Sequence, residues 1–259
     1  MDYIHSWSGG KDSTASIILD FIHNSPPIAR KVIFAEVMFD KERDISGETP
    51  AHIEWINTIA IPRLESMGFE VIKARADRDY IDCFFRVRSK CKDQTQNGKI
   101  YGYPVAGGCI VNRDVKMNAI KKANKIAGKA VQILGIAVDE PERLAGMHKR
   151  GNQISLLEKY GYTEGMALDL CKKWGLLSPI YSTRSRGGCW FCPNARIAEM
   201  AETKDKHPEL WSELEKLSHV PNTVARGFRW GESFTSVDRR VDQYLRAKWM
   251  KENQLKWDV

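Results

Sequence analysis

The sequence predicts an α/β fold: an open, mostly parallel sheet with helices on both faces, followed by a C-terminal helical appendage. Short apolar runs alternate with segments of helical periodicity, which is typical of a parallel sheet. The chain has 259 residues, 42% of them hydrophobic, so it can bury a large core. Beyond about residue 200 strand-like runs stop, while aromatic and basic residues become frequent. We therefore expect an α/β domain over residues 1–199 and a helical appendage over 200–259.

Four segments have the composition of buried strands, at residues 3–7, 32–39, 69–72 and 130–138. The run at 32–39 is almost unbroken in its apolar character, as expected for a strand that is covered on both faces. After residue 187 no further strand is predicted.

Helices are expected between these strands. The first is indicated by apolar residues at helical spacing that stop before the Ser25-Pro26-Pro27 break: Ala15, Ile18, Leu19 and Ile22. Thr49-Pro50 marks the start of a second helix, which should end by Gly68 and kink or break at Pro62. Two more helices are predicted at 79–90 and 112–127.

Composition narrows the function classes. No apolar stretch approaches the roughly 20 residues that span a bilayer, and the first residues have no basic, apolar leader, so we expect a cytoplasmic protein without membrane association. Six cysteines in such a protein favour metal or thiol chemistry over a disulfide framework. The net charge of +7 suits an anionic ligand.

The most informative motif is Ser8-Gly9-Gly10-Lys11-Asp12-Ser13, between the first predicted strand and the first helix. Two glycines allow successive N–H groups to converge on an anion, and a helix N-terminus adds unpaired donors. Lys11 adds a full charge, and the two serines add hydroxyls. A tight turn with a capped helix is the alternative, but the loop ends the first strand, where open α/β sheets bind ligands. The spacing is not that of a Walker loop.

This loop resembles the pyrophosphate loop of the ATP pyrophosphatase (PP-loop) superfamily, in its phosphoadenosine phosphosulfate (PAPS) reductase-like branch. Three further segments are similar to that branch, in the same order. They are Phe39-Asp40 with Gly47-Glu48-Thr49-Pro50, the run from Leu134 through Gly135 to Arg143, and Ser178-Pro179-Ile180-Tyr181 followed by Arg186-Gly-Gly-Cys-Trp-Phe-Cys-Pro193. Ala137 and Pro141 depart from the pattern of the second segment. The resemblance covers roughly residues 1–200.

The resemblance implies an adenine nucleotide alpha hydrolase-like fold that binds ATP or a related adenine nucleotide. Members that use ATP split it between the α and β phosphates and leave an adenylated intermediate. The expected catalytic residues are Lys11, Asp12 and Arg143. The expected nucleotide-binding residues are Ser8, Gly9, Gly10, Lys11, Asp12, Ser13, Asp40, Gly135, Glu140 and Arg143. Either Asp12 or Asp40 is a candidate ligand of Mg²⁺, and Arg143 either contacts a phosphate or pairs with Glu140 or Glu142.

Periodicity separates the cysteines into two kinds. Cys83 shares a helical stripe with Tyr80, Phe84 and Val87, and Cys171 shares one with Ala167, Leu170 and Trp174, so both are predicted to be buried. The remaining four are Cys91, Cys109, Cys189 and Cys192, which lie in irregular segments, and the last two form a Cys-x-x-Cys pair. Such a pair is found in zinc sites, iron–sulfur sites and redox dithiols. The histidines give no information.

The resemblance places a cysteine at Cys109, so we expect Cys109, Cys189 and Cys192 to hold an iron–sulfur cluster, with zinc as the alternative metal. Cys91 is the candidate fourth ligand, unless that position is open. We also expect the nucleotide site and the cysteine site to face one cleft.

Two interpretations of the reaction follow from the resemblance. Sulfonucleotide reductases of the family use a cysteine near the C-terminus, and no cysteine follows Cys192 in this sequence. We therefore favour an enzyme that adenylates a substrate for sulfur transfer, using a sulfur donor or partner protein. Reduction of a sulfonucleotide by another route, and a nucleotide-binding subunit that depends on a partner, stay open.

The charge distribution is compatible with a nucleic acid substrate. Basic residues cluster before and along the fourth predicted helix, around the cysteine pair and in the tail: Arg113, Lys116, Lys121, Lys122, Lys125, Lys129, Arg184, Arg186, Arg196, Arg226, Arg229, Arg239, Arg240 and Arg246. Basic side chains neutralise phosphates, and interleaved aromatic residues such as Trp230 can stack on bases. Solvated helix faces explain the same pattern, so both interpretations stay open.

Overall fold

The computed structural model describes residues 2–104, 109–127, 130–184, 187–225 and 227–254. Contacts between residues divide the chain into two units. Unit 1 comprises Met1–Met38, Glu48–Asp77 and Lys116–Gly188, and unit 2 comprises Phe39–Gly47, Arg78–Val115 and Cys189–Val259. The predicted domain boundary at residues 199/200 falls inside unit 2, and the cysteine pair groups with the C-terminal helices.

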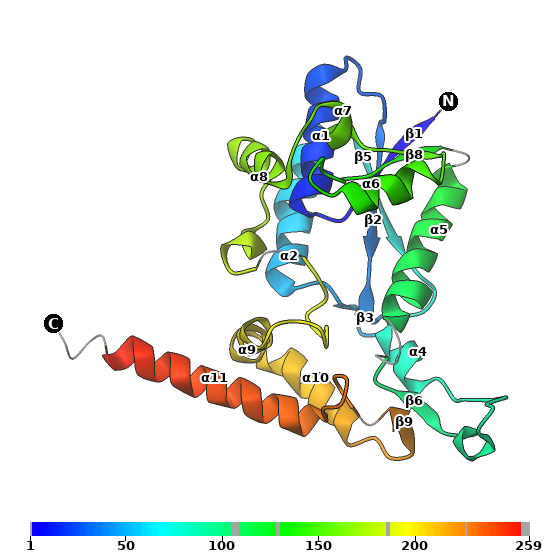
Figure 1. The fold of residues 1–259 in the computed structure, drawn as a ribbon, viewed down its shortest axis with the longest axis vertical. Coiled ribbons are helices and arrows are strands. Elements are labelled where there is room, and N and C mark those ends of the chain that lie inside the picture. Colours follow the sequence, from blue (N-terminus) through cyan, green and yellow to red (C-terminus); the bar gives the residue numbers. More distant parts are fainter. Residues whose placement is uncertain (1, 105–108, 128–129, 185–186, 226, 255–259) are drawn as a thin grey trace. The chain divides into compact units, whose positions relative to one another are not determined.

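Unit 1 is built on a five-stranded sheet in the order β5-β2-β1-β7-β8, with every neighbouring pair parallel (Figure 1). The strands are β1 (Tyr3–Trp7), β2 (Lys31–Glu36), β5 (Glu70–Arg75), β7 (Val131–Ile133) and β8 (Gln153–Ile154). The predicted open parallel α/β fold is confirmed. The sequence did not indicate β8, because two residues carry no periodic pattern.

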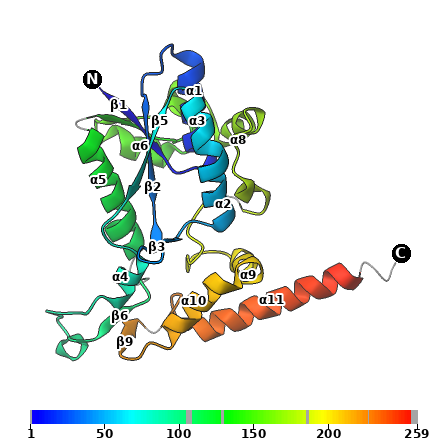
Figure 2. The same ribbon diagram turned by 180° about the vertical axis from the view of Figure 1, so that it is seen from behind.

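Helices cover both faces of this sheet (Figure 2). Two successive residues of β2 pack into different clusters, one on each face of the sheet. Phe34 packs in a cluster with Ile18 of α1 (Lys11–His23), and Ile33 packs in a second cluster with Ala123 of α5 (Met117–Ala127). Burial on both faces accounts for the apolar run that the sequence shows at this strand.

The second predicted helix is continuous in space but changes its winding. It runs through α2 (Pro50–Trp55), a π-helical turn (Ile56–Ala60) and α3 (Ile61–Ser66). The Ile61 N–H reaches the carbonyl of Ile56, five residues back. Because Pro62 has no N–H, a wider turn just before it lets the helix continue where a kink or break was predicted. The helices α6 (Pro141–His148), α7 (Leu156–Lys159) and α8 (Glu164–Lys173), and the short helix η4 (Pro179–Ser182), complete unit 1.

The strand order reverses beside β1. Its neighbour on one side is β2, which follows it in the chain, and on the other side is β7, which comes much later. The segments that leave the C-terminal ends of β1 and β7 therefore start side by side at a switch point, where ligands bind in open α/β sheets. These are the two segments that carry the glycine-rich loop and Gly135.

Unit 2 holds a bundle of three helices in mutual contact, α9 (Ile197–Lys206), α10 (Pro208–Ser218) and α11 (Phe234–Gln254). It also contains α4 (Tyr80–Phe85), two short helical turns (Gln94–Gln96 and most of Asn112–Lys116), and two strand pairs. The pairs are β3 (Met38–Asp40) with β4 (Ile45–Ser46), and β6 (Ile100–Gly102) with β9 (Thr223–Ala225). Stacked and tilted aromatic rings fill its core, with Phe39 against Tyr80, Trp190 and Phe191.

Four details of the predicted elements are wrong. The strand predicted at 130–138 is only β7, at Val131–Ile133. The predicted strand at 32–39 is two strands, because Val37 interrupts it between β2 and β3. The helix predicted at 79–90 ends at Phe85, so Val87 leaves the predicted stripe and is 60% exposed. A strand does form after residue 187, since β9 pairs in parallel with β6. Among the described residues, no helix is long and apolar enough to cross a membrane.

Candidate functional site

The loop after β1 has the conformation that its glycines predict. Gly9 lies in the left-handed region with φ +71°, and Gly10 is the N-cap of α1. The Ser13 hydroxyl donates to the Gly10 carbonyl at 3.1 Å, and the Ser8 and Ser13 hydroxyl oxygens are 3.3 Å apart. Gly10 has no side chain and so offers no cap to the first turn of α1. The N–H groups of Gly10 and Lys11 donate instead to Ser8 Oγ at 3.4 Å and to the Tyr181 hydroxyl at 2.9 Å, contacts that a bound anion would replace.

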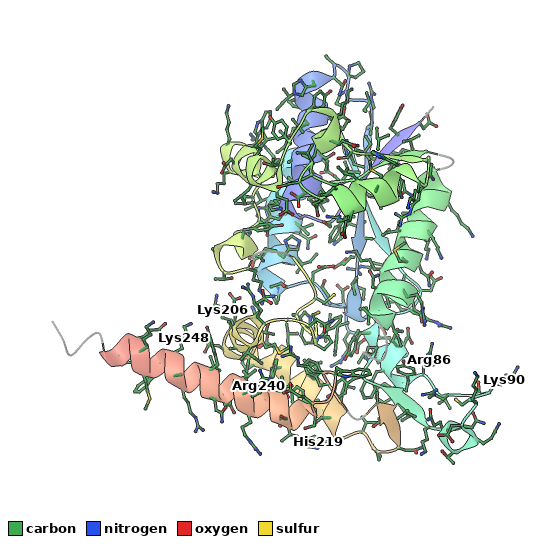
Figure 3. The ribbon with its side chains drawn as sticks, in the orientation of Figure 1. Arg86, Lys90, Lys206, His219, Arg240 and Lys248 are labelled. Atoms are coloured by element: carbon green, nitrogen blue, oxygen red, sulfur yellow. The ribbon has the colours of Figure 1, made fainter. Side chains whose placement is uncertain are left out.

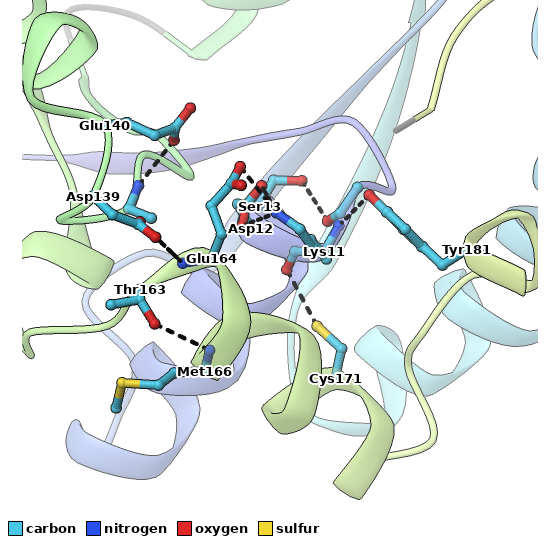
Figure 4. A network of polar contacts seen from close by, with 12 residues as sticks. Lys11, Asp12, Ser13, Asp139, Glu140, Thr163, Glu164, Met166, Cys171 and Tyr181 are labelled. Carbon is cyan, nitrogen blue, oxygen red and sulfur yellow. Dashed lines mark hydrogen bonds and ion pairs between the residues drawn. The ribbon is translucent and has the colours of Figure 1, made fainter. Parts of the chain in front are cut away.

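Lys11 is held by two carboxylates at this loop (Figure 4). Its Nζ donates to Asp12 Oδ1 at 2.8 Å and lies 3.1 Å from Glu164 Oε1, at the start of α8. Burial alone would lower the pKa of Lys11, but the hydrogen bonds to Asp12 and Glu164 outweigh it and raise that pKa. Lys11 is therefore a permanent cation at the loop.

Asp12 lies in surroundings that disfavour its negative charge. Burial raises the pKa of its carboxyl, the contact with Lys11 opposes that shift, and the charges of Glu164 and Glu140 add to it. Asp12 and Glu164 thus share one ammonium, and the charge of Glu140 acts on Asp12 as well, an arrangement in which a bound cation would relieve repulsion.

Gly135 brings the second predicted segment onto the loop. A Cβ built on Gly135 would lie 2.3 Å from the backbone N of Ser13 and 2.5 Å from the carbonyl carbon of Asp12. Backbone atoms cannot move aside as a flexible side chain can, so only glycine fits here. The structure therefore brings Gly135 together with Asp12 and Ser13, although the chain separates them by more than 120 residues.

Glu140 and Arg143 form an ion pair with each other. Glu140 also accepts the Ala137 N–H at 3.1 Å, which fixes the turn into α6, and Arg143 lies in the first turn of that helix. The arginine side chain is 58% exposed. Of the two interpretations left open for Arg143, the structure contains the ion pair with Glu140, and phosphate contact stays a prediction.

Three side chains that were not predicted as site residues contact the loop. The Tyr181 hydroxyl, on η4, accepts the Lys11 backbone N–H at 2.9 Å, and the Cys171 thiol donates to the Lys11 carbonyl at 3.2 Å (Figure 4). His52, on α2, contacts the Ser8 carbonyl. Tyr181 lies in a segment that carries the family resemblance, so a signal existed. For His52 no such signal existed, in keeping with the expectation that the histidines give no information in the sequence.

Asp40 belongs to unit 2. Its carboxylate accepts hydrogen bonds from Arg43, from the backbone N at 3.0 Å and from Nε at 2.6 Å. These bonds outweigh the effect of burial and lower the pKa of Asp40. Its predicted role with a nucleotide or Mg²⁺ stays a prediction.

Three of the four candidate metal ligands line one cavity of about 310 Å³ in unit 2. They are Cys109, Cys189 and Cys192. The other walls are mostly aromatic or apolar: Tyr80, Tyr103, Pro104, Val111, Phe191, Pro193, Asn194, Phe228 and Trp230. Cys91 is not among the lining residues, and its thiol accepts a hydrogen bond from Arg88 Nε at 3.3 Å.

The cysteine pair forms a tight turn, since the Cys192 N–H donates to the Cys189 carbonyl at 3.1 Å. As they stand, no three His, Cys, Asp or Glu side chains of the described residues form a group able to hold a metal ion. The chemistry of the three residues suits a thiolate-bound metal, because three thiols line one cavity and Cys109 is exposed, and a metal at this place stays a prediction.

The remaining two cysteines are buried, as predicted. Cys83 is 4% exposed and Cys171 is fully covered. Burial raises the pKa of Cys83 to about 11 and that of Cys171 to about 12. Both thiols therefore stay protonated near neutral pH, unlike metal ligands.

The predicted basic surface stays a prediction. Figure 3 labels one of its members, Arg240, which lies on α11 and donates to both carboxylate oxygens of Glu232. Arg184 is wrong as a member of an exposed patch: it is 7% exposed and donates to the Thr49 hydroxyl within unit 1. Lys129, Arg186 and Arg226 lie outside the described residues.

No family model, no curated protein and no solved structure matches this chain. The candidate sites belong to different units, and their common cleft stays a prediction.

Proposed function

We propose that the chain is a PP-loop enzyme of the PAPS reductase-like type, which uses an adenine nucleotide to adenylate a substrate for sulfur transfer. The observation that carries this proposal is the fit of Gly135 against the backbone of Asp12 and Ser13. The glycine-rich loop and the segment around Gly135 lie far apart in the sequence, and each resembles the same family. They meet at the switch point of a parallel sheet, where ligands bind in open α/β sheets, and this supports the proposal.

The loop residues have distinct roles in this proposal. The N–H groups after Gly9 and the Ser8 and Ser13 hydroxyls bind the β and γ phosphates of ATP. Lys11 exchanges Glu164 for a phosphate oxygen, which is a modest cost because Glu164 is half exposed. Asp12 is the residue that would hold Mg²⁺, and a cation there would relieve the repulsion by Glu164 and Glu140 that adds to the effect of burial on the pKa of Asp12.

The reaction that follows has two displacements. An oxygen of the acceptor attacks the α phosphorus, the bond between that phosphorus and the bridging α–β oxygen breaks, and pyrophosphate leaves with both electrons of the bond. Preorganised donors in the loop stabilise the charge that develops on pyrophosphate. A sulfur nucleophile then attacks the activated carbon, and AMP leaves with the former acceptor oxygen.

Cys109, Cys189 and Cys192 are the residues that would hold an iron–sulfur cluster, with zinc as the alternative. A cluster with an open iron would supply a site at which a sulfur atom is bound for transfer. The aromatic walls of the same cavity suit a planar heterocycle, so a base of a nucleic acid is the acceptor class that we favour.

The test is nucleotide binding and turnover by the purified full chain. ATP with Mg²⁺ should bind in isothermal titration calorimetry, and Lys11→Ala should weaken it at least several-fold through loss of a charge-assisted contact. Lys172→Ala is the matched control, because this exposed lysine pairs only with Asp169 in the described contacts.

Turnover distinguishes the alternatives. Release of pyrophosphate from ATP in the presence of RNA or DNA supports adenylation. Reduction of a sulfonucleotide without pyrophosphate release favours the reductase, and binding without turnover favours a partner-dependent subunit. Equal ATP affinity in Lys11→Ala and in Lys172→Ala would remove the proposal.

A further inference from the structure

A buried histidine contacts the backbone of the glycine-rich loop (residues 8–13). His52 is 1% exposed and lies on α2, outside the loop motif. Its Nε2 is 3.1 Å from the Ser8 carbonyl oxygen, and its Nδ1 is 2.8 Å from the Ser178 hydroxyl oxygen. All three residues belong to unit 1, so one ring connects the loop to the segment before η4.

These two contacts fix the tautomer of the ring. A carbonyl oxygen can only accept, so Nε2 carries a proton and donates to Ser8. In a neutral ring Nδ1 is then an acceptor, and the Ser178 hydroxyl donates to it. Burial lowers the pKa of His52, the contact with Ser8 opposes this shift, and the nearby charge of Lys116 adds to it. The lowered pKa agrees with a neutral ring.

The ring also sets the shape of the turn at Gly9. A Cβ on Gly9 would lie 2.6 Å from Cε1 and 2.7 Å from Nε2 of His52. Gly9 has φ +71°, so this position needs glycine both for its backbone conformation and for the close approach of the ring. Trp55 stacks on the ring, with centroids 5.9 Å apart and planes 13° apart, and limits its movement.

We propose that His52 is a positioning residue of the glycine-rich loop, which fixes the Ser8 carbonyl and the left-handed turn at Gly9 so that the N–H groups that follow converge on a polyphosphate. This inference rests on the proposed function for its ligand. It assigns a role in binding to α2, which contributes no residue to the loop motif itself.

Two variants separate positioning from packing. His52→Gln keeps a donor near the place of Nε2, whereas His52→Leu fills the space without one. We expect His52→Leu to weaken binding of Mg²⁺–ATP by about five- to tenfold, the effect of losing one buried hydrogen bond. His52→Gln should bind close to wild type. His148→Gln, an exposed histidine of the same unit paired with Glu158, is the control.

A second measurement needs no ligand. Long-range ¹H–¹⁵N spectra should show His52 as the neutral Nε2–H form at pH 7, and the amide signals of Gly9 and Gly10 should shift in His52→Leu but not in His52→Gln. An Nδ1–H ring, unchanged amide signals in His52→Leu, or equally weak binding by both variants would overturn the proposal. If the wild-type chain binds neither ATP nor pyrophosphate, the proposed function fails, while the tautomer and the amide signals still decide the role of His52.

Discussion

Gly135 packs so closely on Ser13 that a single methyl group does not fit between them, since a Cβ would stand 2.3 Å from the Ser13 nitrogen. The φ angle of Gly135 is not in the left-handed region, so sterics alone demand glycine at this position. The contact joins the segment after β7 to the N-terminus of α1. Any residue larger than glycine must therefore displace the first turn of that helix.

This contact makes Gly135→Ala a sharp test of the assembled site. We expect the substitution to lower the free energy of unfolding by about 1–3 kcal/mol, as overpacking against backbone does. Because the first turn of α1 shifts, ATP affinity should fall at least about tenfold.

Gly146→Ala is its matched control. Nothing lies within 4 Å of a Cβ at Gly146, which is in the helix α6. Alanine there should stabilise the fold by about 0.5–1 kcal/mol through helix propensity and leave ATP affinity unchanged. Calorimetry and chemical unfolding measure both effects, and wild-type affinity in Gly135→Ala would show that the two segments do not share a ligand.

Under the proposed function, Glu164 would compete with a bound phosphate for Lys11. Its Oε1 lies 3.1 Å from the Lys11 Nζ, and its side chain is 48% exposed. Glu164→Gln removes a negative charge from the site, so we expect it to raise ATP affinity by about two- to fivefold, the range of an exposed ion pair. The gain should shrink as salt is added.

Asp169→Asn is the control, because Asp169 lies on the same helix and pairs with Lys172. It should change neither the ATP affinity nor the dependence of that affinity on salt. Weaker ATP binding in Glu164→Gln would instead mean that Glu164 orients Lys11.

The sheet and the loop could be predicted because their signals are local. The apolar run near Phe34 indicates a strand covered on both faces, and Gly9-Gly10 next to Lys11 indicates an anion site wherever a strand precedes and a helix follows. The resemblance alone singled out Gly135, whose role in binding stays a prediction. Its steric reason appears once the backbone of Ser13 lies against it.

The missed features depend on distant partners. The Tyr181 hydroxyl meets Lys11 across 170 residues of sequence, and His52 becomes a loop contact only because the fold brings α2 to the Ser8 carbonyl. The strand at 223–225 is three residues long and exists because residues 100–102 pair with it. No periodic pattern can reveal such contacts, since each is decided by tertiary packing.

Asp20 gives a prediction for the dependence of stability on pH. Its carboxylate is fully buried and accepts hydrogen bonds from His5 Nε2 at 3.0 Å, Ile28 N at 2.9 Å and Ala29 N at 3.1 Å. Burial alone would raise its pKa, but these bonds outweigh burial and lower it. A carboxyl whose pKa is lowered by folding stabilises the fold above its unfolded value of about 3.9, and this stabilisation is lost as pH falls through the folded value.

We therefore expect Asp20→Asn to cost about 1–3 kcal/mol in the free energy of unfolding at pH 7, because one acceptor becomes a donor against buried N–H groups. The difference from wild type should shrink as the pH is lowered below about 4. Urea unfolding from pH 7 to pH 3 measures it, with the exposed Asp77→Asn as control. A difference that stays constant over this range would show that Asp20 is not ionised in the fold.

The cysteine cavity predicts which thiols a metal needs. Cys109, Cys189 and Cys192 line one space, whereas Cys91 lies elsewhere in unit 2, with its sulfur bonded by Arg88, and Cys83 is buried on α4. Protein purified without oxygen should be brown, and Cys109→Ser, Cys189→Ser or Cys192→Ser should each remove the visible absorption, since a cluster loses stability with any of its thiolate ligands. Cys91→Ser should keep the colour if an external ligand completes the site, and Cys83→Ser serves as the control for a thiol outside it.

Loss of colour in Cys91→Ser would make Cys91 the fourth ligand and require the segment around it to move. A colourless protein with one zinc per chain would keep the site and change its metal, whereas a chain that binds neither metal would leave the three thiols as a redox or substrate-facing group.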